Sequence, residues 1–253
     1  MKSAVVWIAG GESYTIDAIE SRESFKRWHP DIPCILATDV KHVPSGYDGL
    51  IELSPRRYPD IWYLDSTRYV GEAFNALRND FDNILFLDTD TYISAPIDDL
   101  FELADRFDIS VSHGVTRQTT NTVSYIPNSF PEFEIGVMLV KTNEHVKNLF
   151  ADWLELYESH PEVYKNNDQG PLREALWINK YINMYVLTEE YHARFGFGVC
   201  VVSTVRILHN RSCGENPHTN AQAALEINAV GGRRLFGPEG IVGKPIASGI
   251  QYD

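Results

Sequence analysis

The 253-residue chain has few cysteines, no long apolar run and fewer basic than acidic side chains. Its three cysteines, Cys34, Cys200 and Cys213, include no Cys-x-x-Cys pair, which argues against a disulfide scaffold and a zinc ribbon. Such sparse cysteine suits a reducing compartment, and we expect a cytoplasmic protein. The apolar run at residues 4–9 is too short for a signal peptide or a membrane span, and no later run is long enough. We therefore expect no transmembrane segment.

Basic residues are outnumbered, with 22 Lys and Arg against 35 Asp and Glu, and the formal net charge is −13. A field of that sign repels nucleic acid and anionic membranes, so we expect neither as a partner. A phosphorylated substrate remains compatible with this charge, because a local cation can override the global field. With 43% hydrophobic and 23% charged residues, the composition predicts a globular domain with a sizeable core.

The hydrophobic pattern alternates between strands and helices. Strands are predicted at 4–9, 34–38, 84–87, 109–112, 135–140, 186–187 and 205–208. Helices are predicted at 14–28, 66–79 and 168–181, and a further amphipathic helix is predicted to begin after a cap at Asn143. This order indicates an α/β sheet, largely parallel in its first half. After residue 212 the pattern gives way to Gly, Asn and Pro, so we expect 213–253 to be an irregular tail that packs on the same domain.

The most informative segment is the Asp88-Thr89-Asp90 triplet, which directly follows the apolar strand predicted at 84–87. Mg²⁺ and Mn²⁺ prefer oxygen ligands and often share them with substrate phosphates. Two carboxylates at this spacing can face one such cation, which would neutralise charge on a diphosphate leaving group. An isolated Asp-x-Asp pair is more often a solvated turn or a helix cap. The buried strand before it, and residues further along the chain, favour a metal site instead.

Four segments carry a resemblance to a known family. Residues 85–92, LFLDTDTY, resemble the Asp-x-Asp strand of the A-type glycosyltransferases, especially the glycogenin-like and galactosyltransferase-like group. In the same order, residues 134–140 resemble a strand on the acceptor side, 167–169 resemble an Asp-Gln pair that opens a helix near the donor sugar, and 205–209 resemble a late strand ending in a metal-binding histidine. The resemblance covers residues 1–212 at the level of motifs.

The resemblance implies one A-type domain at 1–212, with a Rossmann-like mixed sheet flanked by helices. Residues 1–110 would form the nucleotide-binding half and 111–212 the acceptor-side half. It also implies a metal-dependent glycosyltransferase that moves a sugar from a nucleotide-diphosphate donor, which we expect to be a UDP-sugar, to a glycan or another hydroxyl acceptor. The group is mostly retaining, so we expect retention.

The candidate site residues divide by role. By resemblance, Mn²⁺ or Mg²⁺ would bind Asp88, Asp90 and His209, catalysis would involve Asp168 and Gln169, and the acceptor side would include Glu134 and Gly136. Asp168 would be a general base in an inverting enzyme, whereas Asp168 or Gln169 would stabilise an oxocarbenium-like species or act as nucleophile in a retaining one. The donor nucleotide would lie against Ala9, Gly10, Asp39, Arg68, Asp88, Thr89 and Asp90.

Each of these residues also has a purely structural interpretation. His209 would be a histidine satisfied at a strand end, and Asp168 is a good helix N-cap. Arg68 would be a surface helix arginine, and Asp39 a loop residue after a strand. Gly10 follows Ala9 at the end of the first strand, where a glycine allows either a simple turn or the close approach of a nucleotide.

Two positions depart from the group's pattern. Glu134 stands where the group usually has asparagine, so we expect acceptor recognition to differ. The group often continues after the late histidine as His-x-x-Gly-x-x-Lys, whereas this chain reads HNRSCG from His209. The lysine that would hold the diphosphate is absent at that spacing, and Arg211 is the candidate substitute.

Three other functions fit parts of the sequence. Sugar-1-phosphate nucleotidyltransferases also have Ala-Gly-Gly after the first strand, but residues 10–14 lack their arginine. Haloacid-dehalogenase-type phosphatases have Asp-x-Asp after a strand, but with Thr or Val where this chain has Tyr92. A non-catalytic sugar-nucleotide-binding module is the third alternative, and the full set of candidate site residues favours an enzyme over it.

Overall fold

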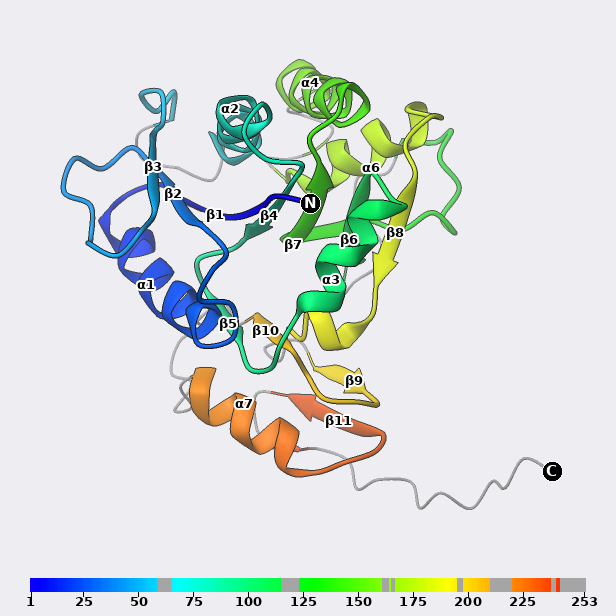
Figure 1. The fold of residues 1–253 in the computed structure, drawn as a ribbon. Helices are drawn as coiled ribbons and strands as arrows, with labels where there is room; N and C mark the ends of the chain where they lie inside the picture. The colour runs from blue at the N-terminus through cyan, green and yellow to red at the C-terminus, as the bar shows by residue number, and fades with distance from the viewer. Residues whose placement is uncertain are drawn as a thin grey trace.

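The computed structural model describes residues 1–58, 65–114, 123–160, 164, 167–194, 198–209, 220–237 and 240–241. A seven-stranded mixed sheet lies at its centre, in the order β3-β2-β1-β4-β7-β6-β8 (Figure 1). The strands β3, β2, β1 and β4 are parallel, β7 is antiparallel to β4 and to β6, and β8 is parallel to β6. The bounds are β1 Ser3–Ala9, β2 Cys34–Thr38, β3 Gly49–Glu52, β4 Asn83–Leu87, β6 Ile109–His113, β7 Phe133–Lys141 and β8 Met184–Leu187.

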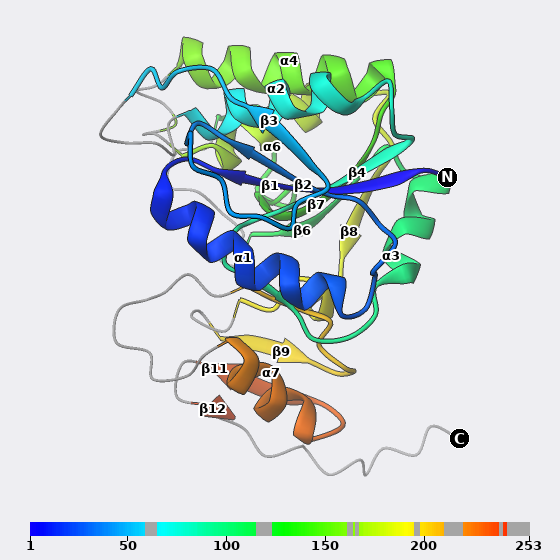
Figure 2. The same ribbon diagram turned by 60° about the vertical axis from the view of Figure 1, so that its left-hand side comes forward.

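Helices cover both faces of this sheet, which confirms the predicted α/β class and its parallel first half. On one face lie α2, α4 and α6, and on the other lies α1 (Figure 2). The helix bounds are α1 Glu12–Lys26, α2 Ser66–Leu77, α3 Asp98–Glu102, α4 Glu144–Ser159 and α6 Gln169–Ile178, with 3₁₀ turns at Leu103–Asp105 and Glu189–Tyr191. The predicted boundary near residue 110 falls within β6, so strands from both proposed halves share one sheet. The division of binding roles between the halves stays a prediction.

Alternate side chains of β1 point into two different cores. Ala4 and Val6 pack in the cluster under α2 and α4, whereas Val5, Trp7 and Ala9 pack in the cluster under α1. A strand buried on both faces reads as a continuous apolar run, which is why its position could be predicted from the sequence.

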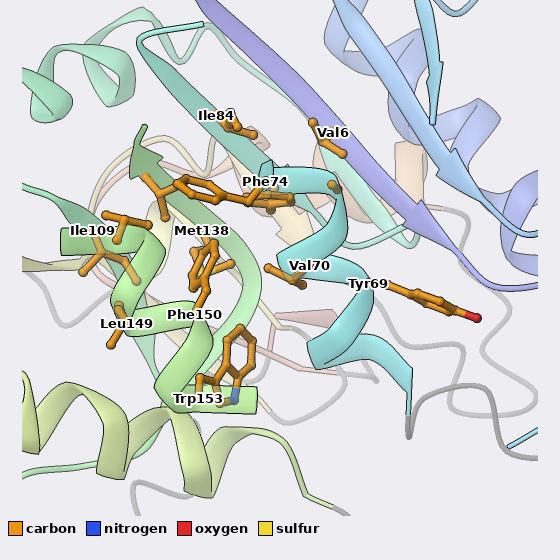
Figure 3. Close-up of a cluster of buried hydrophobic side chains, with 14 of the residues drawn as sticks. Val6, Tyr69, Val70, Phe74, Ile84, Ile109, Met138, Leu149, Phe150 and Trp153 are labelled. Carbon is orange, nitrogen blue, oxygen red and sulfur yellow. The ribbon is translucent and has the colours of Figure 1, made fainter. Parts of the chain in front are cut away.

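The larger core lies between the sheet and the α2–α4 pair. Figure 3 shows Val6 from β1, Phe74 from α2, and Phe150 and Trp153 from α4 converging there. Phe74 and Phe150 meet edge to face, with ring centroids 5.1 Å apart. The predicted cap of α4 is confirmed, because the Asn143 side chain accepts a hydrogen bond of 2.9 Å from the backbone N–H of Val146.

The segment after residue 212 corrects one prediction. Its described part is not irregular, because it contains α7 Asn220–Ala229 and the strands β11 Arg234–Gly237 and β12 Gly240–Ile241, which form a small sheet with β9 Val199–Val201. Ala223, Ala224 and Ile227 of α7 pack in a third apolar cluster. The flanking Gly, Asn and Pro obscured this short, alanine-rich helix, whose residues have good helix propensity. The remainder of 213–253 lies outside the described residues.

Several short strands also escaped prediction. The edge strand β3 has only four residues, none fully buried. The three-residue β5, Thr91–Ile93, follows the Asp-x-Asp triplet and pairs with β10, Ile207–His209, in a separate two-stranded sheet. Such strands are too short for a periodic signal. Within the described ranges, no helix is both long and apolar enough to span a membrane.

Phe74→Ala should destabilise the protein by about 3–5 kcal/mol, because it removes a fully buried ring and leaves a cavity against Phe150. Urea unfolding followed by circular dichroism measures this change. Leu225→Ala is the matched control, since Leu225 is 74% exposed, and a change within about 0.5 kcal/mol is expected. Equal losses in the two variants would contradict the described packing.

Candidate functional site

The Asp88-Thr89-Asp90 triplet forms the turn between β4 and β5. Asp88 N–H continues the sheet by donating to the Gly136 carbonyl at 2.9 Å, and the Asp88 carbonyl accepts from both Thr91 N–H and Thr91 Oγ1. Thr89 is buried. The two carboxylates therefore stand at the carboxyl end of a fully buried strand, as the sequence predicted.

The turn is also held from the α1 side. Thr91 Oγ1 lies 2.7 Å from Ser21 Oγ, which in turn accepts from Trp7 Nε1 at 2.8 Å. All three side chains are buried. This polar chain through the apolar core fixes the first residue of β5, and with it the position of Asp90.

His209 reaches the turn from the end of β10. The antiparallel register places His209 opposite Thr91, one residue beyond Asp90. His209 Nε2 lies 3.0 Å from Asp90 Oδ1 and 3.3 Å from Asp88 Oδ2. The structure thus brings together the three predicted metal ligands, whose candidate ligand atoms all lie within 4.8 Å of one another.

The chemistry of this cluster fits a hard divalent cation. The imidazole of His209 is buried, whereas the side chains of Asp88 and Asp90 are 36% and 24% exposed, so a ligand can reach the carboxylates. Among the described residues, His209 Nε2 has ion-pair distances to both acids but no well-directed hydrogen bond. A buried ring nitrogen aimed between two carboxylates, at 3.0 and 3.3 Å from their oxygens, is the arrangement that a divalent cation shared by all three would satisfy.

His192, which sequence reasoning assigned no role, orients His209. Its Nε2 lies 2.6 Å from His209 Nδ1, and both rings are buried. When Nδ1 of a metal-binding histidine is held by such a partner, Nε2 is the nitrogen left for the metal. The sequence offered no signal for this pair, because 17 residues separate the two histidines.

Charge coupling within the cluster is strong. Burial lowers the pKa of His209, but the carboxylates of Asp90 and Asp88 outweigh burial and raise the pKa to about 9. Burial, followed by the charges of His209, Arg194 and His113, holds the pKa of His192 well below its ordinary value. On the neighbouring α1, burial and the charge of Asp90 raise the pKa of Asp17, another acid that the sequence did not single out.

Gly136 lies under the cluster and leaves no room for a side chain. A Cβ at this position would be 2.4 Å from His209 Cε1 and 2.9 Å from Asp88 Oδ2. The register between β6 and β7 shifts beside it, so residues 135–137 have no partner on β6. Such irregularities often re-aim a strand next to a functional site. Contact of Gly136 with an acceptor stays a prediction.

A second group of predicted residues meets at the start of α6. Asp168 accepts a hydrogen bond of 2.8 Å from Ser66 Oγ. The Gln169 side chain donates from Nε2 to Glu134 Oε2 at 2.9 Å, and Arg194 donates to Glu134 Oε1 at 2.6 Å. Glu134 and Gly136 lie two residues apart in β7, so this strand joins the second group to the Asp88, Asp90 and His209 cluster across roughly 7 Å.

Glu132 is a buried acid beside the second group that the sequence did not reveal. It is only 2% exposed, and among the described residues its Oε1 has no hydrogen-bond partner. Burial raises its pKa to about 7, with Arg173 opposing this shift and Glu134 and Asp168 adding to it. The sequence feature that could have indicated Glu132 is its position two residues before Glu134.

The predicted nucleotide side lies at the same edge of the sheet. Ala9 ends β1 and is buried beside Gly10, and its carbonyl accepts from Thr38 Oγ1 at 2.7 Å. Asp39 follows β2, accepts from Gly11 N–H at 2.9 Å and pairs with Arg56. Burial alone would raise the pKa of Asp39, but Arg56 and the Gly11 amide outweigh it and lower the pKa. In open α/β sheets, this edge is where ligands bind.

The Arg68 guanidinium is hydrogen-bonded to other groups of the protein. Its guanidinium donates to Asp65, to Glu72 and to the Pro55 carbonyl, and it thereby holds the segment after β3. A contact between Arg68 and a nucleotide stays a prediction. Arg211 lies outside the described residues.

Comparison with solved structures identifies the architecture. The galactosyltransferase LgtC, solved with donor and acceptor sugar analogs, matches with a TM-score of 0.58 and 16% identity over 87% of this chain and 91% of LgtC. The chain has the A-type glycosyltransferase fold. The glycosyltransferase GlyE of Streptococcus pneumoniae TIGR4 matches with a TM-score of 0.54 and 18% identity over 78% of this chain, which spans about half (48%) of GlyE. No protein-family model matches the sequence, and no curated protein sequence matches it.

Gly136→Ala should weaken Mn²⁺ binding about 10- to 100-fold, because the added Cβ must displace His209 or Asp88, two of the predicted ligands. Isothermal titration calorimetry measures the affinity. Gly71→Ala is the matched control, since a Cβ there meets nothing within 4 Å in α2 and should leave metal binding unchanged while slightly favouring the helix. Unchanged Mn²⁺ affinity in Gly136→Ala would contradict the assigned metal site.

Metal binding should release about one proton at pH 7.5, because a metal binds neutral imidazole and the pKa of His209 is raised to about 9. In the metal-free protein, the ion pair of His209 with the two acids stabilises the fold fully below pH 6.5 and loses this contribution as the pH rises through 9. Mn²⁺ affinity should therefore increase between pH 6.5 and 9. Calorimetry in two buffers of different ionisation enthalpy counts the proton, and His209→Asn should release none. No proton release from the native protein would refute the assignment.

Proposed function

We propose that this protein is a metal-dependent glycosyltransferase that moves a sugar from a nucleotide-diphosphate donor to a hydroxyl acceptor. The observation that carries the proposal is the Asp88, Asp90 and His209 cluster at the carboxyl end of β4. The cluster stands at the ligand-binding edge of a sheet whose fold is shared with LgtC and GlyE. Fold alone does not specify an activity, so the proposal rests on the cluster and its neighbours.

The cluster would hold Mn²⁺ or Mg²⁺, which would neutralise the charge that develops on the diphosphate when the sugar leaves. His192 orients His209 so that Nε2 faces the two acids. Gly136 allows β7 to pass directly beneath His209 and Asp88. These residues define where the diphosphate would lie.

The nucleoside part of the donor would lie along the ends of β1 and β2. Ala9, Gly10 and Gly11 bring backbone close to this edge, and Asp39 would accept hydrogen bonds from a base or ribose. Arg56 pairs with Asp39 and so holds that carboxylate in place at this edge. A UDP-linked donor is proposed on the resemblance to the glycogenin-like and galactosyltransferase-like group.

The reacting sugar would lie between the metal cluster and the start of α6. Ser66 and the start of α6 fix Asp168, and Glu134 holds Gln169. With retention, which we propose, Asp168 and Gln169 would stabilise positive charge on the anomeric carbon. The acceptor hydroxyl would approach from the side of Glu134 and Glu132, where the chain differs from the group's usual asparagine.

A panel of nucleotide sugars tests the proposal through release of the free nucleoside diphosphate. We expect turnover with Mn²⁺ that EDTA abolishes, and at least a 100-fold loss in Asp90→Asn, because the stabilisation of the leaving group is removed. Asp80→Asn, which changes an exposed acid that precedes β4, at the opposite end of that strand from the cluster, should keep full activity. Full, EDTA-insensitive activity in Asp90→Asn would contradict the proposal. Calorimetric binding of a nucleotide without consumption of any donor would indicate a binding module instead.

A further inference from the structure

Glu134 uses both carboxylate oxygens to bind neighbouring side chains. Oε1 accepts from Arg194 Nη1 at 2.6 Å and Oε2 accepts from Gln169 Nε2 at 2.9 Å. Glu134 is 5% exposed and Arg194 is 5% exposed, whereas Gln169 is only half-buried. The hydrogen bonds therefore run from a buried cation, through a buried acid, to a glutamine at the edge of the site.

The polarity of this chain of hydrogen bonds follows from elementary chemistry. A guanidinium only donates, a carboxylate only accepts, and a carboxamide has one end of each kind. Glu134 can therefore pair only with the nitrogen end of the Gln169 amide. We propose that Glu134, paired with Arg194, is a positioning residue that turns the carbonyl oxygen of Gln169, and not its NH₂ group, toward the donor sugar. This inference rests on the proposed glycosyltransferase function.

The orientation matters because the anomeric carbon becomes positively charged as the sugar leaves. The carbonyl oxygen carries the negative end of the amide dipole and would stabilise that charge, whereas a reversed amide would oppose it. A dipole that is fixed in advance needs no reorganisation during the reaction, which is the general source of such stabilisation. The asparagine usual at position 134 in the group has both a donor and an acceptor and so could not fix the amide by polarity alone.

Arg194 stabilises the buried carboxylate of Glu134 and determines the direction of the hydrogen bonds around it. A buried carboxylate without a partner is strongly destabilising, and Arg194 supplies the opposite charge at 2.6 Å. Because Arg194 only donates, it also determines what a substitution at position 134 does. In Glu134→Gln, the new carbonyl oxygen would accept from Arg194, so the new NH₂ would donate to Gln169 and reverse its amide.

Nuclear magnetic resonance tests the orientation without any substrate. In the native protein, the Gln169 side-chain NH₂ signals, assigned by their loss in Gln169→Glu, should show one proton shifted downfield and slowed in exchange with water. Both effects should vanish in Glu134→Gln and persist in Glu155→Gln, a control that removes an exposed acid on α4. Rapid exchange of both protons, at the chemical shifts of a solvent-exposed glutamine amide, would overturn the proposal, and this outcome is read from the native protein whether or not Glu134→Gln folds.

Kinetics then test the consequence. Glu134→Gln should lower kcat about 100-fold while leaving the KM for the donor little changed. The exchange variant Glu134→Gln with Gln169→Glu restores an oxygen facing the sugar, since Gln at 134 would donate to the new carboxylate, and it should recover at least tenfold in kcat over Glu134→Gln. A merely structural role predicts no such recovery, and its absence would refute the positioning role. If the NMR result holds but no donor is consumed by the native protein, the proposed function fails and the amide orientation stands.

Discussion

The antiparallel pairing of β10 with β5 is the contact on which the candidate site depends. It sets His209 opposite Thr91, and so beside Asp90, although these residues lie far apart in the chain. The pairing is supported from both sides. His192 holds the His209 ring, and Ser21 on α1 holds Thr91. Since these partners are buried, the position of the imidazole is determined by the packing of the core and not by a loop.

β7 connects this cluster to the second group of acids. Its backbone at Gly136 accepts from Asp88 N–H, and a side chain two residues earlier, Glu134, holds Gln169. Residues 135–137 do not pair with β6. This part of β7 can therefore bend toward the candidate site instead of running alongside β6. One short segment of backbone therefore sets the distance between the metal cluster and the start of α6.

How much the sequence could predict depended on the kind of signal. The strand before Asp88 and the cap at Asn143 were predictable, because a run buried on both faces and a side-chain cap are local features. The prediction that His209 is a metal ligand rested only on the order of the motifs, and the structure brings its ring to the two acids. The partner of that ring, His192, was not predictable, because the His192–His209 contact depends on tertiary packing alone. The helix α7 was missed for a different reason, since its alanine-rich stretch is short and lies between segments rich in Gly, Asn and Pro.

The local charges explain how so acidic a protein can offer a site for a diphosphate. Without metal, the formal charges of Asp88, Asp90 and protonated His209 sum to −1. The negative charge of Asp90 also raises the pKa of the nearby Asp17. In the proposed function, a divalent cation would displace the His209 proton, and the same three side chains and the cation would then sum to zero. The proton on His209 thus acts as a weaker substitute for the metal, keeping two acids together in the metal-free protein. Exchange of that proton for a divalent ion would remove the net negative charge at the place where the leaving group would gain one. The overall charge of −13 would then be no obstacle to a phosphorylated donor. The electrostatic energy of a bound diphosphate depends mainly on charges within a few ångströms, because salt screens the more distant surface charges.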